Sequence, residues 1–208
     1  FTLMNKLGLD TASQIVKDFC EEHSGFSFPT SLQKSKDNGQ WDISTIVKTV
    51  QDKVAIFTLR RPKVLNALNL NVIAELESGL LEVENNDSIL GSVITGFGVK
   101  AFVSGADINM LAGLKTPKEG YENARSFQVV FSRIQQMNKP IICAMNGFAF
   151  GGGNELAMSC TMRISKKDLP ILACQPEVNL GFIPGAGGTQ RLPRLVGLDI
   201  ASDILRTG

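Results

Sequence analysis

Two glutamates occupy glycine-rich segments in which a carboxylate could act as an acid or a base. Glu155 follows three consecutive glycines, Gly151 to Gly153, between a predicted apolar strand and a predicted helix. Since glycine costs backbone entropy, such a run indicates that another group needs the space. The N–H groups of Gly152 and Gly153 would lie at a helix N-terminus, where unpaired donors and the helix dipole favour an anion. The alternative is close helix–strand packing, with Glu155 only complementing the dipole.

The second glutamate, Glu177, lies in the segment from Gln175 to Leu192, which reads QPEVNLGFIPGAGGTQRL. A turn punctuated by Pro and Gly after an apolar strand can aim a carboxylate into a cleft. A solvated glutamate in a surface loop is the alternative, and the segment alone does not decide between them.

A third segment, Lys100 to Ile108, reads KAFVSGADI. Small residues at Ser104, Gly105 and Ala106 allow another molecule to approach the backbone, and an N–H near Ala106 is then free to donate to a ligand oxygen. The alternative is a tight turn in which Asp107 caps the next helix.

Composition and spacing exclude several kinds of site. A single histidine, His23, rules out a multi-histidine metal site and disfavours a Ser–His–Asp triad, so we expect no metal. No Gly-Lys-Ser/Thr sequence is present, and the dinucleotide pattern fails because Leu156 and Gln190 occupy its last position. The net charge of +1 gives no global field for a nucleic acid or a membrane. We therefore expect neither as a partner.

The elements that must position these segments alternate between strands and helices. The apolar patterns predict strands at 54–59, 89–95, 140–145, 162–165 and 171–174, and helices at 69–84, 119–137, from the glycines through 160, 187–195 and 198–206. Repeated β-α units predict an α/β fold with a mainly parallel sheet covered by helices.

The first part of the chain differs in pattern. Residues 1 to about 41 have helical spacing of apolar residues, and no strand pattern appears before residue 46. Ser24 to Asn38 is rich in Ser, Pro, Lys and Gly, which predicts a loop and linker. We therefore expect a short helical segment at 1–41 and a catalytic domain at 46–208.

The three segments together, AFVSGADI, NGFAFGGGNELA and QPEVNLGFIPGAGGTQRL, resemble the crotonase (enoyl-CoA hydratase/isomerase) superfamily from about residue 46 to the end. The resemblance implies a crotonase-like ββα-superhelix and the hydration of a 2-enoyl-CoA to a 3-hydroxyacyl-CoA. It implies that the N–H groups of Ala106 and Gly152 form an oxyanion hole, with Glu155 as the base and Glu177 as the acid. CoA belongs to the substrate, so no separate cofactor is expected.

The same resemblance implies further contacts to the acyl-CoA thioester. The substrate-binding positions that we expect are Ser104, Gly105, Asp107, Ile108 and Gly151. Isomerases of the superfamily tend to keep the position of Glu177 and lose that of Glu155, so both glutamates favour hydration. An isomerase and a truncated, inert acyl-CoA-binding module are the alternatives.

The N-terminal stretch FTLMNKLGLD is similar to the C-terminal tail of a 3-hydroxyacyl-CoA dehydrogenase. This likeness implies a fragment of a bifunctional dehydrogenase/hydratase, with a crotonase domain truncated at its C-terminus. Members of the superfamily are trimers or hexamers, which we expect of the full-length protein. The four cysteines form no CxxC pair, which suits reduced thiols and a cytoplasmic location.

Overall fold

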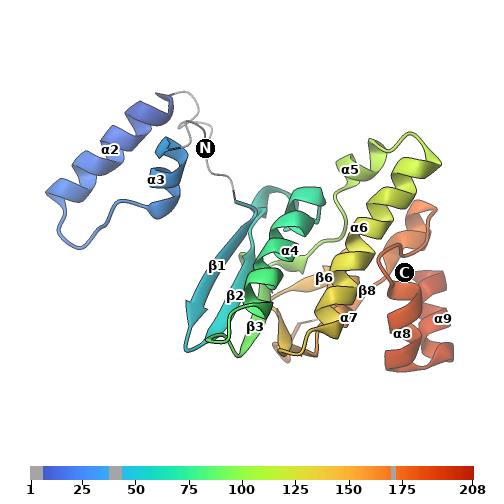
Figure 1. Ribbon diagram of the computed structural model, residues 1–208. Coiled ribbons are helices and arrows are strands. Elements are labelled where there is room, and N and C mark those ends of the chain that lie inside the picture. The colour runs from blue at the N-terminus through green and yellow to red at the C-terminus, as the bar shows by residue number, and fades with distance from the viewer. Residues whose placement is uncertain (1–6, 38–43, 170–171) are drawn as a thin grey trace. The chain divides into compact units, whose positions relative to one another are not determined.

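The computed structural model of the chain describes residues 7–37, 44–169 and 172–208. Contacts group the chain into two units, residues 1–44 and 45–208. The predictions for Phe1 to Lys6 and for residues 38–41 lie outside the described residues. The structure is shown in Figure 1.

The N-terminal unit contains two helices, α2 (Leu9–Glu22) and α3 (Thr30–Asp37), which pack on each other. Its helical character is as predicted, but the loop predicted from Ser24 to Asn38 is wrong over α3. The α3 turn begins at Pro29, whose oxygen accepts from the N–H groups of Leu32 and Gln33 at 3.0 Å each. Leu32 is buried, and this packing outweighs the weak helical preference of the Ser- and Lys-rich sequence.

The larger unit contains two sheets. The first has the strand order β1 (Ile46–Gln51), β2 (Val54–Leu59), β3 (Gly91–Gly96), β5 (Ile141–Met145), β7 (Met162–Ser165). The second has the order β4 (Ala101–Val103), β6 (Phe148–Phe150), β8 (Ala173–Cys174). Only the β1–β2 pair of these sheets is antiparallel, and the others are parallel, which confirms the mainly parallel α/β prediction.

The chain passes repeatedly from the first sheet to the second and then into a helix. β3 is followed by β4, β5 by β6 and β7 by β8, and each turn adds one parallel strand to each sheet. The helical elements are η1 (Pro62–Val64), α4 (Leu70–Glu84), α5 (Ile108–Ala112), α6 (Pro117–Gln136), α7 (Gly152–Ser159), η2 (Pro176–Leu180), α8 (Gly188–Val196) and α9 (Leu198–Thr207). The result is a superhelix of ββα turns.

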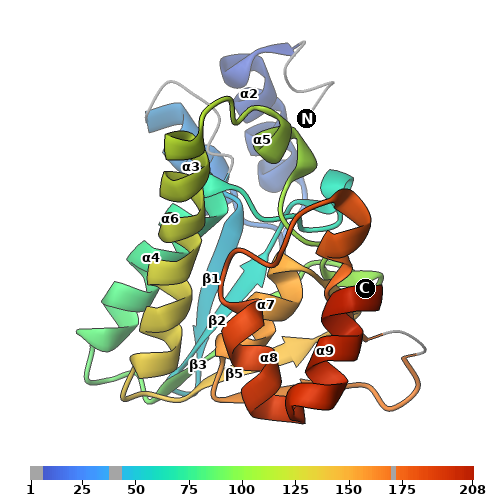
Figure 2. The same cartoon turned by 90° about the vertical axis from the view of Figure 1, so that its right-hand side faces the viewer.

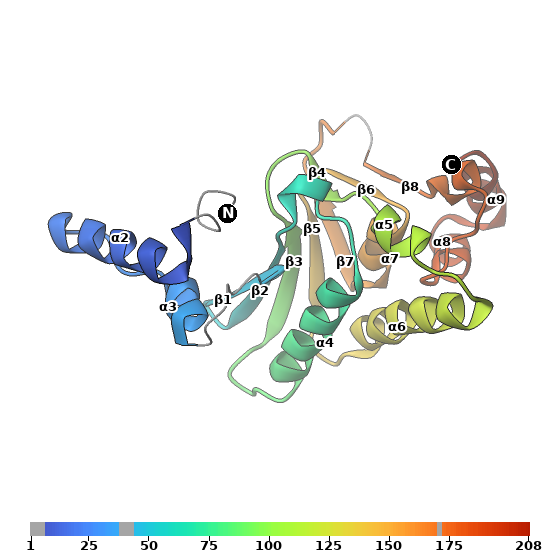
Figure 3. The same ribbon diagram turned by 90° about the horizontal axis from the view of Figure 1, so that it is seen from above.

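Helix α7 is the centre of this arrangement. Figure 3 shows it between the second sheet and the neighbouring helices α4 and α6, and it contacts β4, β6, α6 and α8. Every one of its residues is buried. Helices α8 and α9 pack side by side at the end of the chain (Figure 2). Any polar side chain on α7 therefore lies in the protein interior.

Three strands occupy residues for which the sequence pattern predicts none. β1 is joined to β2 by a turn at Asp52 and Lys53, which both have positive φ (48° and 65°). Turns of this kind usually have the sequence Asn-Gly or Asp-Gly, and because this one does not, the sequence does not identify the hairpin. β4 and β6 have only three residues each. Strands this short do not show an alternating pattern.

Close packing of α4 on β2 generates a stability prediction. A Cβ atom on Gly79 would overlap Cε1 of Phe57, whereas one on Gly120, near the start of α6, would have no neighbour within 4 Å. We expect Gly79→Ala to lower the free energy of unfolding by about 1–2 kcal/mol, because overpacking exceeds the helical preference of alanine. The matched control, Gly120→Ala, should raise it by about 0.5–1 kcal/mol. Urea denaturation of both variants measures this, and equal effects would contradict the packing argument.

Candidate active site

A cavity of about 410 Å³ lies where α7, η2 and the residues after β4 meet. Eight of the nine site residues predicted from the sequence line it: Ser104, Gly105, Ala106, Ile108, Gly151, Gly152, Glu155 and Glu177. Its other walls are largely apolar and include Leu111, Leu114, Phe127, Leu180 and Phe182. Three segments that are far apart in the sequence therefore converge on one apolar pocket with two carboxylates.

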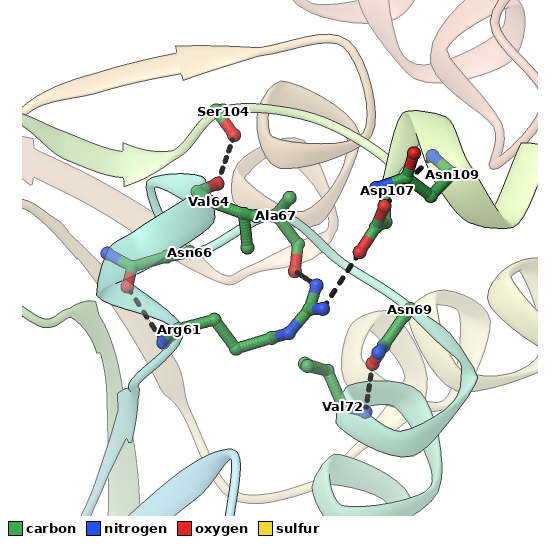
Figure 4. Close-up of polar contacts among 9 residues, drawn as sticks. All are labelled: Arg61, Val64, Asn66, Ala67, Asn69, Val72, Ser104, Asp107 and Asn109. Atoms are coloured by element: carbon green, nitrogen blue, oxygen red, sulfur yellow. Dashed lines mark hydrogen bonds and ion pairs between the residues drawn. The ribbon is translucent and has the colours of Figure 1, made fainter. Parts of the chain in front are cut away.

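The ninth residue, Asp107, is not among the lining residues. Its carboxylate instead accepts from Arg61 Nη2 at 2.8 Å and from the N–H of Asn109 at 3.0 Å (Figure 4). The second contact caps α5, so the capping role considered for Asp107 is confirmed. The segment is at once a helix start and a cavity wall.

The three glycines before Glu155 each permit a different close approach. Gly151 has φ +49°, and a Cβ there would lie 2.8 Å from Oε1 of Glu177. A Cβ on Gly152 would lie 3.4 Å from the nitrogen of Ala106, and one on Gly153 would overlap the main-chain oxygen of Val103. Both interpretations of this run therefore hold, because Gly153 serves packing while Gly151 and Gly152 open the site.

Two main-chain N–H groups are available to a ligand. Gly152 is the first residue of α7, so its N–H has no acceptor within the helix. Neither this N–H nor that of Ala106 has a protein acceptor among the described residues. They lie close together on the cavity wall, where the positive end of α7 adds to their attraction for an anion.

Glu155 is held in one orientation by the chain that follows η2. Its Oε1 accepts from the N–H groups of Gly188 at 2.6 Å and Ala186 at 2.8 Å. Burial of the side chain, which is 2% exposed, raises the pKa of Glu155 from 4.5 to about 7. The N–H of Gly188 opposes this rise and the charge of Glu177 adds to it. Glu155 therefore exchanges a proton near neutral pH.

Glu177 is positioned by η2 at the opposite side of Gly151 and is also buried. Burial raises the pKa of this carboxyl group too, which favours its protonated form. Because the charge of Glu177 also influences Glu155, the two groups titrate as a pair. One carboxylate and one carboxylic acid can thus coexist in the cavity.

Gln175 and Arg191 support the glutamates, and neither was singled out from the sequence. The Gln175 carboxamide lies between Asn154 Nδ2, at 2.9 Å, and both Glu177 oxygens, at 3.4 Å. If the Gln175 amide is rotated by 180°, so that its oxygen and nitrogen exchange places, the nitrogen donates to the main-chain oxygens of Cys174 and Gly151 at 3.3 Å. Arg191 Nη1 donates to Ala186 O at 2.9 Å. The sequence signal that could have identified Gln175 is an amide residue directly after an apolar run, and the structure shows that it is fully buried.

The described residues contain no cluster of three or more His, Cys, Asp and Glu side chains that could hold a metal ion. The chemistry that the side chains and main chain can perform is proton transfer by two carboxyl groups, next to a pair of N–H donors for a developing oxyanion.

Comparisons with known proteins identify relatives of this chain. Residues 49–208 match the family model described as Enoyl-CoA hydratase/isomerase. The chain is 43% identical over 166 residues to a short-chain-enoyl-CoA hydratase of Clostridium acetobutylicum, covering 80% of this chain and 62% of the relative. It is 39% identical over 158 residues to a fatty acid oxidation complex subunit alpha of Shewanella frigidimarina, covering 76% of this chain and 22% of that protein.

Solved structures give the same result. A crystal structure of an enoyl-CoA hydratase from Bacillus anthracis superposes with a TM-score of 0.74 at 33% identity, over 79% of this chain and 63% of that one. The crotonase-like fold expected from the motifs is thereby confirmed. The chain spans less than two thirds of the length of these relatives.

The raised pKa of Glu155 predicts how stability depends on pH. In the folded protein Glu155 keeps its proton up to about pH 7, but the unfolded chain loses it near 4.5, so folding loses stability as pH rises through this window. Glu155→Gln removes that loss. We expect the variant to gain on the order of 2–3 kcal/mol over wild type between pH 4.5 and 8. Urea denaturation at several pH values measures this, with Glu122→Gln as an exposed control; parallel curves for Glu155→Gln and wild type would contradict the raised pKa.

Proposed function

Because the chain belongs to the enoyl-CoA hydratase/isomerase family, we propose that its cavity adds water to a 2-enoyl-CoA and forms the 3-hydroxyacyl-CoA. The observation that carries this proposal is the convergence on one apolar cavity of two buried carboxyl groups and two N–H groups that have no protein acceptor in the described part of the chain. The apolar walls suit the acyl chain, while the N–H pair suits the thioester oxygen.

The reaction divides between the main chain and the carboxyl groups. The oxygen of a water bonds to C3 of the substrate, and Glu155 takes one proton of that water. The electrons of the double bond move toward the carbonyl oxygen, where the N–H groups of Ala106 and Gly152 stabilise the enolate. Losing one such donor typically raises a barrier by about 3–4 kcal/mol. Glu177 then gives its proton to C2, and transfer of one proton from Glu155 back to Glu177 restores the site.

The raised pKa of Glu155 is compatible with a base, and the division of roles between the two glutamates follows the family resemblance. A base with a pKa near 7 is largely ionised at slightly alkaline pH and still binds a proton well. Burial also raises the pKa of Glu177, so this carboxyl group holds a proton more readily than a solvated glutamate does, as its proposed role as the acid requires. The presence of both glutamates favours hydration over isomerisation, in which a single carboxyl group can move a proton between two carbons.

The rest of the natural protein is part of the proposal. The N-terminal unit is proposed to be the C-terminal tail of a 3-hydroxyacyl-CoA dehydrogenase, which would make the protein bifunctional. The relative from Shewanella frigidimarina, of which this chain covers 22%, supports a longer protein. We propose a homo-oligomer, a trimer or a hexamer, in the cytoplasm. No helix among the described residues is long and apolar enough to cross a membrane, and the four cysteines are free.

Glu155→Gln and Glu177→Gln test the proposed chemistry. We expect each to lower kcat for crotonyl-CoA hydration by about 10²–10⁴-fold, because each removes one proton-transfer group. Loss of the conjugated enoyl-thioester absorbance measures turnover. Glu122→Gln, on the exposed face of α6, is the matched control and should change kcat by less than about twofold.

Three outcomes separate the competing functions. Consumption of a 3-enoyl-CoA without a hydroxylated product would favour an isomerase. Tight binding of the ester with no turnover would favour an acyl-CoA-binding module. Full activity of either glutamate variant would rule out the two-carboxyl mechanism.

A further inference from the structure

The segment from Arg61 to Leu68, referred to below as the 61–68 loop, runs beside the residues that carry the Ala106 N–H. Leu68 N–H donates to Gly105 O at 2.8 Å, and Asp107 N–H donates to Leu68 O at 2.7 Å. These bonds fix the peptides before and after Ala106 and leave its own N–H without a protein acceptor among the described residues. The direction of this N–H is therefore set by the 61–68 loop.

Two further bonds extend the same ladder. Ser104 donates through its N–H to Leu65 O at 3.1 Å and through its hydroxyl to Val64 O at 3.0 Å. The loop itself is conformationally demanding, because Leu65 and Asn66 have φ values of 50° and 61°. Such a backbone persists only where its surroundings hold it.

Asn66 supplies part of this support. It is buried, and its Oδ1 accepts from Arg61 N–H at 3.1 Å. Its Nδ2 donates to the main-chain oxygens of Phe97 at 2.9 Å, Ala101 at 3.1 Å and Phe102 at 3.2 Å. Asn66 thus anchors the 61–68 loop to the protein core.

One ion pair joins the start of the 61–68 loop to Asp107. Arg61 Nη2 donates to Asp107 Oδ2 at 2.8 Å and its Nη1 donates to Ala67 O at 2.6 Å (Figure 4). The side chains are only 19% and 11% exposed. The Arg61 guanidinium holds the pKa of Asp107 below its usual range, so the pair stays ionised at neutral pH. An ion pair that is mostly buried, and whose arginine donates two hydrogen bonds, contributes more to stability than an ion pair on the solvated surface.

We propose that Arg61 and Asp107 form a positioning pair that fixes the Ala106 N–H at the geometry needed to stabilise the enolate oxygen. The proposal rests on the function proposed above and adds two residues that do not touch the reacting atoms. The cation at the start of the 61–68 loop and the anion next to Ala106 tie the loop to the segment that carries one of the two donors. Without the pair, the main-chain bonds between the loop and residues 104–107 remain, but the loop loses its side-chain tie to Asp107 and holds the Ala106 N–H less precisely toward the oxyanion.

Capping of α5 by Asp107 is a separate role and can be distinguished. Arg61→Met breaks the ion pair and leaves the cap intact. Asp107→Asn keeps an oxygen for the Asn109 N–H and loses the charge. If only the cap mattered, Arg61→Met would be silent. If the pair matters, both variants change the same property, and combining them adds little.

The experiment reads the donors directly with a 4-dimethylaminocinnamoyl-CoA probe. Hydrogen bonds to the carbonyl of this push–pull thioester stabilise negative charge on the oxygen and shift its absorbance to longer wavelength. We expect the wild type to shift the bound probe strongly and Arg61→Met and Asp107→Asn to shift it less. Their kcat for crotonyl-CoA should fall about 10- to 100-fold, because small misplacement of a transition-state contact is costly, while the dissociation constant of the probe changes little.

Matched controls separate positioning from loss of stability. Lys48→Met breaks the Lys48–Glu82 ion pair on β1 and α4 and should leave the shift unchanged. Arg61→Lys keeps the charge and should restore part of the shift. Urea denaturation shows that each variant is folded under the assay conditions, and spectra are compared only for folded protein.

The outcomes distinguish this inference from the proposed function. A wild-type shift that persists unchanged in both Arg61→Met and Asp107→Asn would overturn the positioning role while leaving the hydratase proposal intact. A wild type that shifts the probe but does not hydrate crotonyl-CoA would contradict the hydratase, while the variants still test the pair. A wild type that binds the probe with no shift would overturn both.

Discussion

An N–H group can bind a ligand oxygen inside a protein only if no protein oxygen accepts from it first. Among the described residues, two N–H groups on the cavity wall, those of Ala106 and Gly152, have no protein acceptor. The remaining architecture follows from that constraint. Helix α7 must begin at the cavity wall, so that the N–H of its first residue is available to a ligand. The segment after β4 must also lie against the first turn of α7, which brings the Ala106 N–H close to that of Gly152. Glycines at 151–153 make this approach sterically possible.

The carboxyl groups are subject to an opposite constraint. A carboxylate that is solvated is a weak base, and one that is buried without partners is unstable. Glu155 lies between these limits, since burial raises its pKa to about 7 while the N–H groups of Ala186 and Gly188 prevent a larger rise. The two N–H groups come from α8 and the loop before it, so the last part of the described chain helps to set the pKa of Glu155 on α7.

Much of the fold and the site followed from the sequence because both depend on local signals. Long apolar runs predicted β2, β3, β5 and α4, and the glycine run before Glu155 indicated that space was needed there. Strand β8 of the second sheet was predicted, but β4 and β6 were not, because strands of three residues show no alternating pattern. The contact between Arg61 and Asp107 joins residues 46 positions apart, and no local pattern encodes such a pair. Helix α3 was mistaken for a linker because burial, rather than composition, decides its structure.

The two proposed oxyanion donors belong to the main chain, and this has an evolutionary consequence. Exchange of a side chain at 106 or 152 leaves the N–H in place, and only proline removes it outright. The carboxyl groups at 155 and 177 are side-chain groups, in contrast, and a single residue substitution removes each of them. A lineage descended from this chain can therefore inherit the two N–H donors while replacing the groups at 155 and 177. Under the proposed function, new reactions that share a thioester enolate are then a few substitutions away, with the fold unchanged.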